Sequence, residues 1–117
     1  MNIQIKKEIE EELRKLFTKI KNKTIIVEGK RDKEVLYSFN LTKVYTINHG
    51  LYELSEKFDK KEIIILTDFD REGKEISRKL SLFLQTNNKI DRETRRKIGL
   101  LFSKLHIKTI EELKSLR

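Results

Sequence analysis

The stretch Ile63-Ile64-Ile65-Leu66-Thr67-Asp68-Phe69-Asp70-Arg71-Glu72-Gly73 decides the fold of this chain. Its first part is a short, continuous apolar run, which is typical of a strand that is buried on both faces of a parallel sheet. Its second part places two aspartates one residue apart, followed by a glutamate and a glycine. The stretch therefore predicts a buried strand that leads through a polar turn into a helix.

Two similar units precede this stretch, each with a short apolar strand, a polar turn and a helix. The strands are predicted at 24–27 and 43–47, and the turns at Glu28-Gly29 and Asn48-His49-Gly50. Strands that alternate with helices of this length predict an α/β fold with a parallel sheet and right-handed crossovers. A short fourth strand is predicted near 88–90, at an edge of the sheet.

The flanking segments show helical spacing of apolar residues. We expect one domain over residues 1–117, with a core at 24–88. An amphipathic N-terminal helix is predicted at 3–21 and a C-terminal helical extension at 91–117, whose last helix starts near Thr109.

The composition limits the chemistry that the chain can perform. Without cysteine, and with two histidines, a metal ion is expected to have oxygen ligands. No apolar stretch reaches membrane-spanning length, and Met1–Lys7 lacks the apolar centre of a signal peptide. These features predict a cytoplasmic protein that does not associate with a membrane.

The positive charge lies at the two ends of the chain. Residues 1–23 carry seven basic and four acidic side chains, and residues 89–117 carry nine and four. Residues 24–88 carry eleven of each sign, so the flanks account for the net charge of +8. This distribution suits a polyanionic partner, although lysine-rich helices are equally compatible with ordinary solvated surfaces.

Acidic residues and glycines follow the predicted strands, and the carboxyl ends of parallel strands form the functional crevice of such sheets. Asp68 and Asp70 lie on the same side of an extended segment and can share Mg²⁺, with Mn²⁺ as a substitute. Glu72 can complete that site, and Glu28 can transfer a proton or act as a further ligand. Taken singly, Asp70 and Glu72 also fit helix caps, and Asp32 is predicted to be the N-cap of its helix.

Three segments resemble, in order, spacing and strand-end context, the motifs of the Toprim family: Ile26-Val27-Glu28-Gly29-Lys30-Arg31-Asp32, Asn48-His49-Gly50 and Leu66-Thr67-Asp68-Phe69-Asp70-Arg71-Glu72-Gly73. That family includes type IA topoisomerases, bacterial primases, recombination proteins and the nuclease that matures 5S ribosomal RNA. The resemblance covers roughly residues 24–88 and is closest to that nuclease, to topoisomerase Toprim domains and to small stand-alone members. It implies a Rossmann-like sheet of about four strands sandwiched by helices, and it favours proton transfer as the role of Glu28.

Basic residues and glycines near these motifs are candidates for phosphate contact. A guanidinium suits bidentate phosphate binding, so Arg71 is predicted to be catalytic together with Glu28. The residues predicted to bind phosphate or nucleic acid are Gly29, Lys30, Arg31, His49, Gly50, Gly73, Arg92, Arg95, Arg96 and Lys97.

The leading hypothesis is a Mg²⁺-dependent, RNase-like nuclease, with RNA favoured over DNA. Topoisomerase activity needs a tyrosine nucleophile and a strand-passage clamp, and primase activity needs a nucleotide-handling domain. Both activities are therefore excluded for this single small domain. The alternative is a non-catalytic nucleic-acid-binding or scaffold module whose metal site anchors a phosphate, and a partner protein or a homodimer suits either. A receiver-like phosphotransfer domain also uses clustered acids, but it would need a lysine and a hydroxyl at later strand ends.

Overall fold

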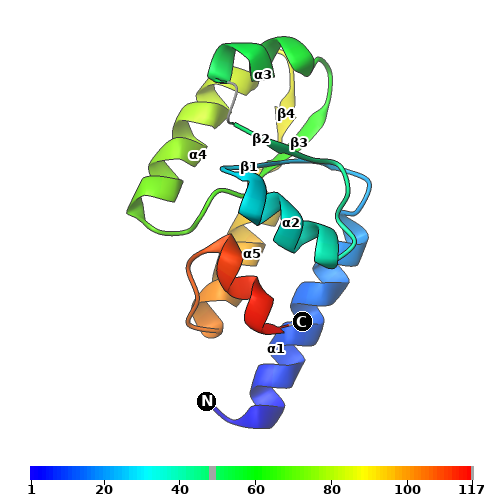
Figure 1. The fold of residues 1–117 in the computed structure, drawn as a ribbon, viewed down its shortest axis with the longest axis vertical. Coiled ribbons are helices and arrows are strands. Elements are labelled where there is room, and N and C mark those ends of the chain that lie inside the picture. Colours follow the sequence, from blue (N-terminus) through cyan, green and yellow to red (C-terminus); the bar gives the residue numbers. More distant parts are fainter. Residues whose placement is uncertain (48–49, 117) are drawn as a thin grey trace.

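The computed structural model describes residues 1–47 and 50–116, which form a parallel four-stranded sheet between two layers of helices (Figure 1). The strands are β1 (Thr24–Val27), β2 (Val44–Thr46), β3 (Glu62–Ile65) and β4 (Lys89–Ile90), in the order β2-β1-β3-β4. All three strand pairs are parallel. The predicted α/β class and the short fourth strand at the edge are therefore confirmed.

The larger core lies on one face of the sheet. Ile25 and Ile64 point into it, because side chains alternate between the two faces of a strand. The elements that cover this face are α1 (Ile3–Lys19), α2 (Lys30–Ser38), α5 (Arg92–Lys104) and the 3₁₀ helix η1 (Ile110–Leu116). In Figure 1 they lie together on one side of the sheet, and the end of η1 contacts α1 through a hydrogen bond from Arg14 to the Leu116 carbonyl.

The smaller core lies on the opposite face. Ile26 of β1 and Ile63 and Ile65 of β3 point into it. Two helices cover this face, α3 (Leu51–Lys57) and α4 (Arg71–Leu84), which lie side by side in Figure 1. Because both faces of the sheet are covered, β1 and β3 are continuous apolar runs.

The last predicted helix differs in type from an α-helix. Residues 110–116 form a 3₁₀ helix, which has three residues per turn. Ile110, Leu113 and Leu116 are spaced by three and are all buried, so this period places them on one face. The predicted start near Thr109 agrees with the structure, where the Glu112 side chain accepts hydrogen bonds from the N–H and the hydroxyl of Thr109.

The prediction for Asp32 was wrong by one helical turn. Helix α2 begins at Lys30, so Gly29 is its N-cap and Asp32 is its third residue. There the Asp32 carboxylate accepts a hydrogen bond from the Gly29 N–H at 3.2 Å. Asp32 therefore stabilises the helix start from inside the first turn.

No helix within the described ranges is both long and apolar enough to span a lipid bilayer.

Candidate functional site

The candidate site lies where β1 and β3 end. These two strands are neighbours and parallel, so their carboxyl ends lie at the same edge of the sheet. Glu28 directly follows β1, and Asp68 follows β3 by three residues. The carboxyl group of Glu28 lies close enough to Asp68 for the charge and the backbone of that residue to affect its pKa. The fold thus joins two acidic groups that are distant in the sequence.

The site concentrates negative charge. The pKa of Glu28 is raised to about 7, first by burial, then by the nearby carboxylate of Asp68, with a smaller contribution from Asp32. Burial likewise raises the pKa of Asp32, although the hydrogen bond from the Gly29 N–H opposes this rise. Both shifts have the same origin, because a carboxylate is less stable away from water and beside other carboxylates.

The C-terminal segment holds the loop that carries Asp68. One side-chain oxygen of Asp68 accepts a hydrogen bond from the Ile110 N–H at 2.8 Å. The N–H of Phe69 donates to the carbonyl of Lys108 at 2.6 Å. Two consecutive residues of the loop are thus fixed by the segment that leads into η1.

Arg95 holds the same loop from α5. Its guanidinium donates hydrogen bonds to the carbonyls of Ile65 and Thr67 at 2.9 Å each, and to that of Asp68 at 3.1 Å. It also lies over the ring of Phe69, 4.5 Å from the ring centroid. Burial lowers the pKa of Arg95 to about 10, although the charges of Glu28 and Asp68 oppose this effect. These internal contacts engage the guanidinium within the fold, and its predicted contact with nucleic acid stays a prediction.

The turn from Asp68 into α4 is tightly folded. Asp70 is the N-cap of α4, and its side chain accepts a hydrogen bond from the Gly73 N–H at 2.8 Å. The Thr67 hydroxyl donates to the Gly73 carbonyl at 2.6 Å. A Cβ on Gly73 would lie 2.1 Å from the carbonyl oxygen of Asp68. Glycine is therefore required here because the backbone of the loop approaches the helix so closely.

Cations stand at the starts of the two helices that follow these strands. Lys30 and Arg71 are the first residues of α2 and α4, and both side chains are exposed, as is that of Arg31. A Cβ on Gly29 would meet no protein atom within 4 Å, so the space beside this glycine is open. Backbone N–H groups at a helix start can bind phosphate, and these cations are placed to support that contact.

The other predicted phosphate contacts have varied surroundings. Asn48 and His49 lie outside the described residues, and Gly50 is the exposed N-cap of α3. Arg92 donates a hydrogen bond to the side chain of Gln85. On the exposed side of α5, Arg96 forms an ion pair with Glu93, and Lys97 is exposed.

The donor set fits a hard divalent cation, because the carboxylates of Glu28 and Asp68 lie together at the same edge of the sheet. Across residues 1–47 and 50–116, however, no three Asp, Glu or His side chains are grouped to hold a metal ion. Asp70 caps α4, and Glu72 is exposed on its first turn. A bound Mg²⁺ would therefore take few protein ligands and complete its shell with water and phosphate, as it does in many sites.

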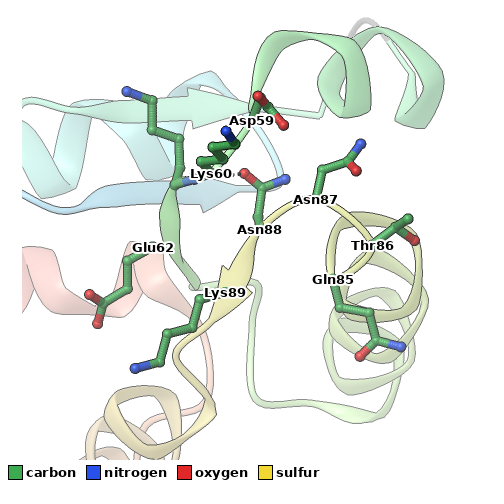
Figure 2. Close-up of a pocket in the computed structure, with 9 residues that line it drawn as sticks. Asp59, Lys60, Glu62, Gln85, Thr86, Asn87, Asn88 and Lys89 are labelled. Atoms are coloured by element: carbon green, nitrogen blue, oxygen red, sulfur yellow. Dashed lines mark hydrogen bonds between the residues drawn. The ribbon is translucent and has the colours of Figure 1, made fainter.

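One cavity lies elsewhere, beside the amino ends of β3 and β4 (Figure 2). It has a volume of about 620 Å³ and is lined by two loop segments, 59–62 and 85–89. The amide of Asn88 is occupied there, since it donates to the carbonyls of Phe58 and Leu84 and accepts from the Lys61 N–H. This cavity is thus a surface depression beside a turn that Asn88 stabilises, and Glu28 and Asp68 do not line it.

A parallel α/β sheet with acidic groups at adjacent strand ends occurs in several classes of phosphate-handling domain, and comparison with known families identifies the class of this chain. The model of the Toprim domain matches residues 23–105, and the chain belongs to the Toprim family. This match extends beyond the predicted core to include α5, the helix that carries Arg95. The family indicates a metal-dependent function related to nucleic acid and leaves the reaction open.

Individual relatives support this assignment. A UPF0292 protein of Pyrococcus abyssi is 38% identical over 97 residues, which cover 79% of this chain and 72% of the relative. A UPF0292 protein of Pyrococcus horikoshii is 39% identical over 97 residues, with the same coverage of 79% and 72%. A solved structure, a putative protein from Aquifex aeolicus, is similar to this chain with a TM-score of 0.68 at 27% identity. The match covers 95% of this chain and 97% of the chain from Aquifex aeolicus.

Two features of the site were missed by sequence reasoning. Asp32 contributes to the charge around Glu28, and Ile110 binds Asp68 through its backbone. The sequence held a signal for the role of Asp32, because this residue lies in the motif that begins at Ile26. The sequence held no signal for the role of Ile110, because a backbone N–H can come from any residue type.

Proposed function

We propose that the chain is a Mg²⁺-dependent phosphodiesterase that hydrolyses nucleic acid, with RNA favoured over DNA. The observation that carries the proposal is the meeting of Glu28 and Asp68 at neighbouring strand ends. Exposed cations at the starts of α2 and α4 support it, because they stand beside the same edge of the sheet. The preference for RNA rests on the similarity to the nuclease that matures 5S ribosomal RNA.

Each residue has a proposed role. Glu28 and Asp68 would hold Mg²⁺, which when bound supplies positive charge opposite the phosphate. As the alternative to holding the ion, Glu28 would exchange a proton at the attacking or leaving oxygen, a role that suits a carboxyl group whose pKa is raised to about 7 in the absence of metal. Lys30 and Arg71 would bind the phosphate oxygens and orient the phosphodiester.

The test compares the wild type with Glu28→Gln and Asp68→Asn on structured RNA and on single- and double-stranded DNA, with Mg²⁺ or Mn²⁺. Glu34→Gln is the matched control, because Glu34 is exposed on α2. We expect metal-dependent cleavage by the wild type and the control, and at least a hundred-fold loss in Glu28→Gln, in line with a general acid–base role of roughly 10²–10⁴-fold. Equal cleavage by Glu28→Gln and Glu34→Gln would overturn the role of Glu28.

A second readout is independent of turnover. Mg²⁺ that binds the folded protein raises its melting temperature by mass action. We expect this rise in the wild type and in Glu34→Gln, and a smaller rise in Asp68→Asn. The absence of any rise in the wild type up to millimolar Mg²⁺ would contradict the metal site itself.

One observation favours a second function, that of a non-catalytic nucleic-acid-binding or scaffold module. Within the described parts of the chain no three-ligand metal group is formed, which suits an ion that anchors a phosphate without cleavage. That module would bind nucleic acid in a salt-sensitive manner without cutting it, and Glu28→Gln would leave binding unchanged. The single-domain organisation, the cytoplasmic location and a partner protein or homodimer stay predictions.

A further inference from the structure

A second cavity, of about 480 Å³, adjoins the loop that carries Asp68. It lies between that loop, α5 and the segment that precedes η1. Phe69, Leu100 and Ile107 supply its apolar lining, and Leu100 is 51% exposed. Its volume falls within the range of roughly 300–1,000 Å³ that is common for small-ligand sites. An apolar surface of this kind, open to solvent, is suited to a flat ring.

The charged lining of this cavity is entirely basic. Lys74, Arg96 and Lys108 contribute cationic side chains and His106 an imidazole, and no acidic side chain lines it. Within the described residues Lys74 and Lys108 form no ion pair, whereas Arg96 is paired with Glu93. Lys74 is therefore available to an anionic group of a ligand, and Lys108, whose charge also acts on the Glu112 carboxylate, adds positive charge beside it.

The shared wall between the cavity and the candidate site is Phe69, and its ring is firmly held. The Arg95 guanidinium covers the ring, and Phe102 packs against it edge-on with centroids 5.0 Å apart. A Cβ on Gly99 would lie 2.9 Å from a ring carbon, so the missing side chain makes room for the ring. The cavity is thus a preformed feature fixed to the residue next to Asp68.

We infer that this cavity binds one nucleotide of a single-stranded segment next to the phosphodiester at Glu28 and Asp68. The base would lie against Phe69, Leu100 and Ile107, and a phosphate would contact Lys74 and Lys108, since ring contacts and cations together bind single strands without reading sequence. The inference rests on the proposed function in taking nucleic acid as the ligand. It adds that the substrate is unpaired beside the reacting bond.

The test measures base-dependent binding without cleavage. A labelled hexanucleotide and an abasic strand of equal length and charge are titrated into the protein in EDTA, and fluorescence anisotropy is recorded. One base contact is worth roughly 1–3 kcal/mol, so we expect the intact strand to bind at least about five-fold more tightly than the abasic strand. Leu100→Glu should abolish this ratio, because it places an acid in the cavity.

Matched controls separate the cavity from the general surface. Leu82 is 54% exposed on α4 and does not line the cavity, so Leu82→Glu should keep the five-fold ratio. Lys74→Ala should weaken binding of both strands and lower its salt dependence, whereas Lys79→Ala, an exposed lysine on the same helix, should change it less. Equal binding of intact and abasic strands, or equal effects of Leu100→Glu and Leu82→Glu, would overturn the inference.

The two proposals can fail separately. Metal-dependent cleavage that is lost in Glu28→Gln, together with equal binding of intact and abasic strands, would leave the proposed function standing and remove the nucleotide cavity. Base-dependent binding that is lost in Leu100→Glu, without cleavage in Mg²⁺ or Mn²⁺, would keep the cavity and remove the nuclease.

Discussion

The side chain of Asp68 accepts a hydrogen bond from the backbone N–H of Ile110 at 2.8 Å, although the two residues are 42 positions apart. The C-terminal segment therefore contributes directly to the loop of the candidate site. Ile110 is fully buried, so η1 cannot move without disturbing the core. We conclude that the last segment of the chain is a structural part of the site.

The hydrogen bond between Asp68 and Ile110 predicts different stabilities for two variants. Asp68→Ala leaves the Ile110 N–H without its partner, which costs roughly 1–3 kcal/mol of unfolding free energy. Asp68→Asn keeps an oxygen that can accept this bond and should lose less. Both variants remove the same charge, so their difference in urea denaturation isolates the hydrogen bond. Asp59→Ala, at an exposed position, is the control, and equal stability of the two Asp68 variants would refute the link.

Because of Glu28, we predict that the stability of the metal-free protein depends on pH. Its pKa rises from an ordinary value of 4.5 to about 7 on folding, so the folded state holds this proton more tightly than the unfolded state. The resulting stability is fully present below pH 4.5 and is lost as the pH rises through about 7. Urea denaturation in EDTA should therefore show Glu28→Gln gaining stability relative to the wild type between these pH values. A constant difference across this range would show that Glu28 has an ordinary pKa in the folded protein.

The sequence predicted the sheet well because burial controls its pattern. Strands such as β3, which are covered on both faces, must be continuous apolar runs, and the polar residues beyond them fall at strand ends. The site was predicted to the extent that it follows this rule, which places Glu28 and Asp68 at one edge. The N-cap role of Asp70 was recognised as an alternative for the same reason, since capping is a local interaction.

What could not be predicted depends on the placement of α5 and η1. Arg95 lies in a basic run that has the appearance of a solvated helix surface, and only the docking of α5 turns its side chain toward the end of β3. The local pattern of a helix identifies its apolar face but not the element on which that face packs. Arg95 and Ile110 both act through that tertiary arrangement.

We predict that Arg95→Lys will cause a large loss of stability, although it keeps the positive charge. Arg95→Lys cannot reproduce three hydrogen bonds from a planar fork to the carbonyls of Ile65, Thr67 and Asp68. Buried acceptors that lose a charged donor cost roughly 1–3 kcal/mol, so the unfolding free energy should fall by at least that amount. Hydrogen exchange in the loop after β3 should also accelerate.

The control for Arg95 is Arg92→Lys on the same helix, where the guanidinium is exposed and donates to the side chain of Gln85. Exposed changes of this kind usually alter stability by less than about 0.5 kcal/mol. Similar stability of the two variants in urea would show that the contacts of Arg95 contribute nothing to the fold.

We predict that replacing Gly73 with alanine, a residue that favours helices, will destabilise the protein. Alanine is preferred over glycine inside helices by about 1 kcal/mol, so Gly73→Ala would be stabilising on propensity alone. The new Cβ would lie 2.1 Å from the carbonyl oxygen of Asp68, however, and that backbone is held by Arg95. We expect a net loss of roughly 1–3 kcal/mol, as for overpacked cores, together with a weaker stabilisation by Mg²⁺ because Asp68 is displaced. Lys79→Ala is the matched control, since Lys79 is exposed on the same helix and its substitution adds no atom beside the loop. Thermal melts of both variants with and without Mg²⁺ decide the matter, and equal behaviour would show that the loop yields to the added carbon.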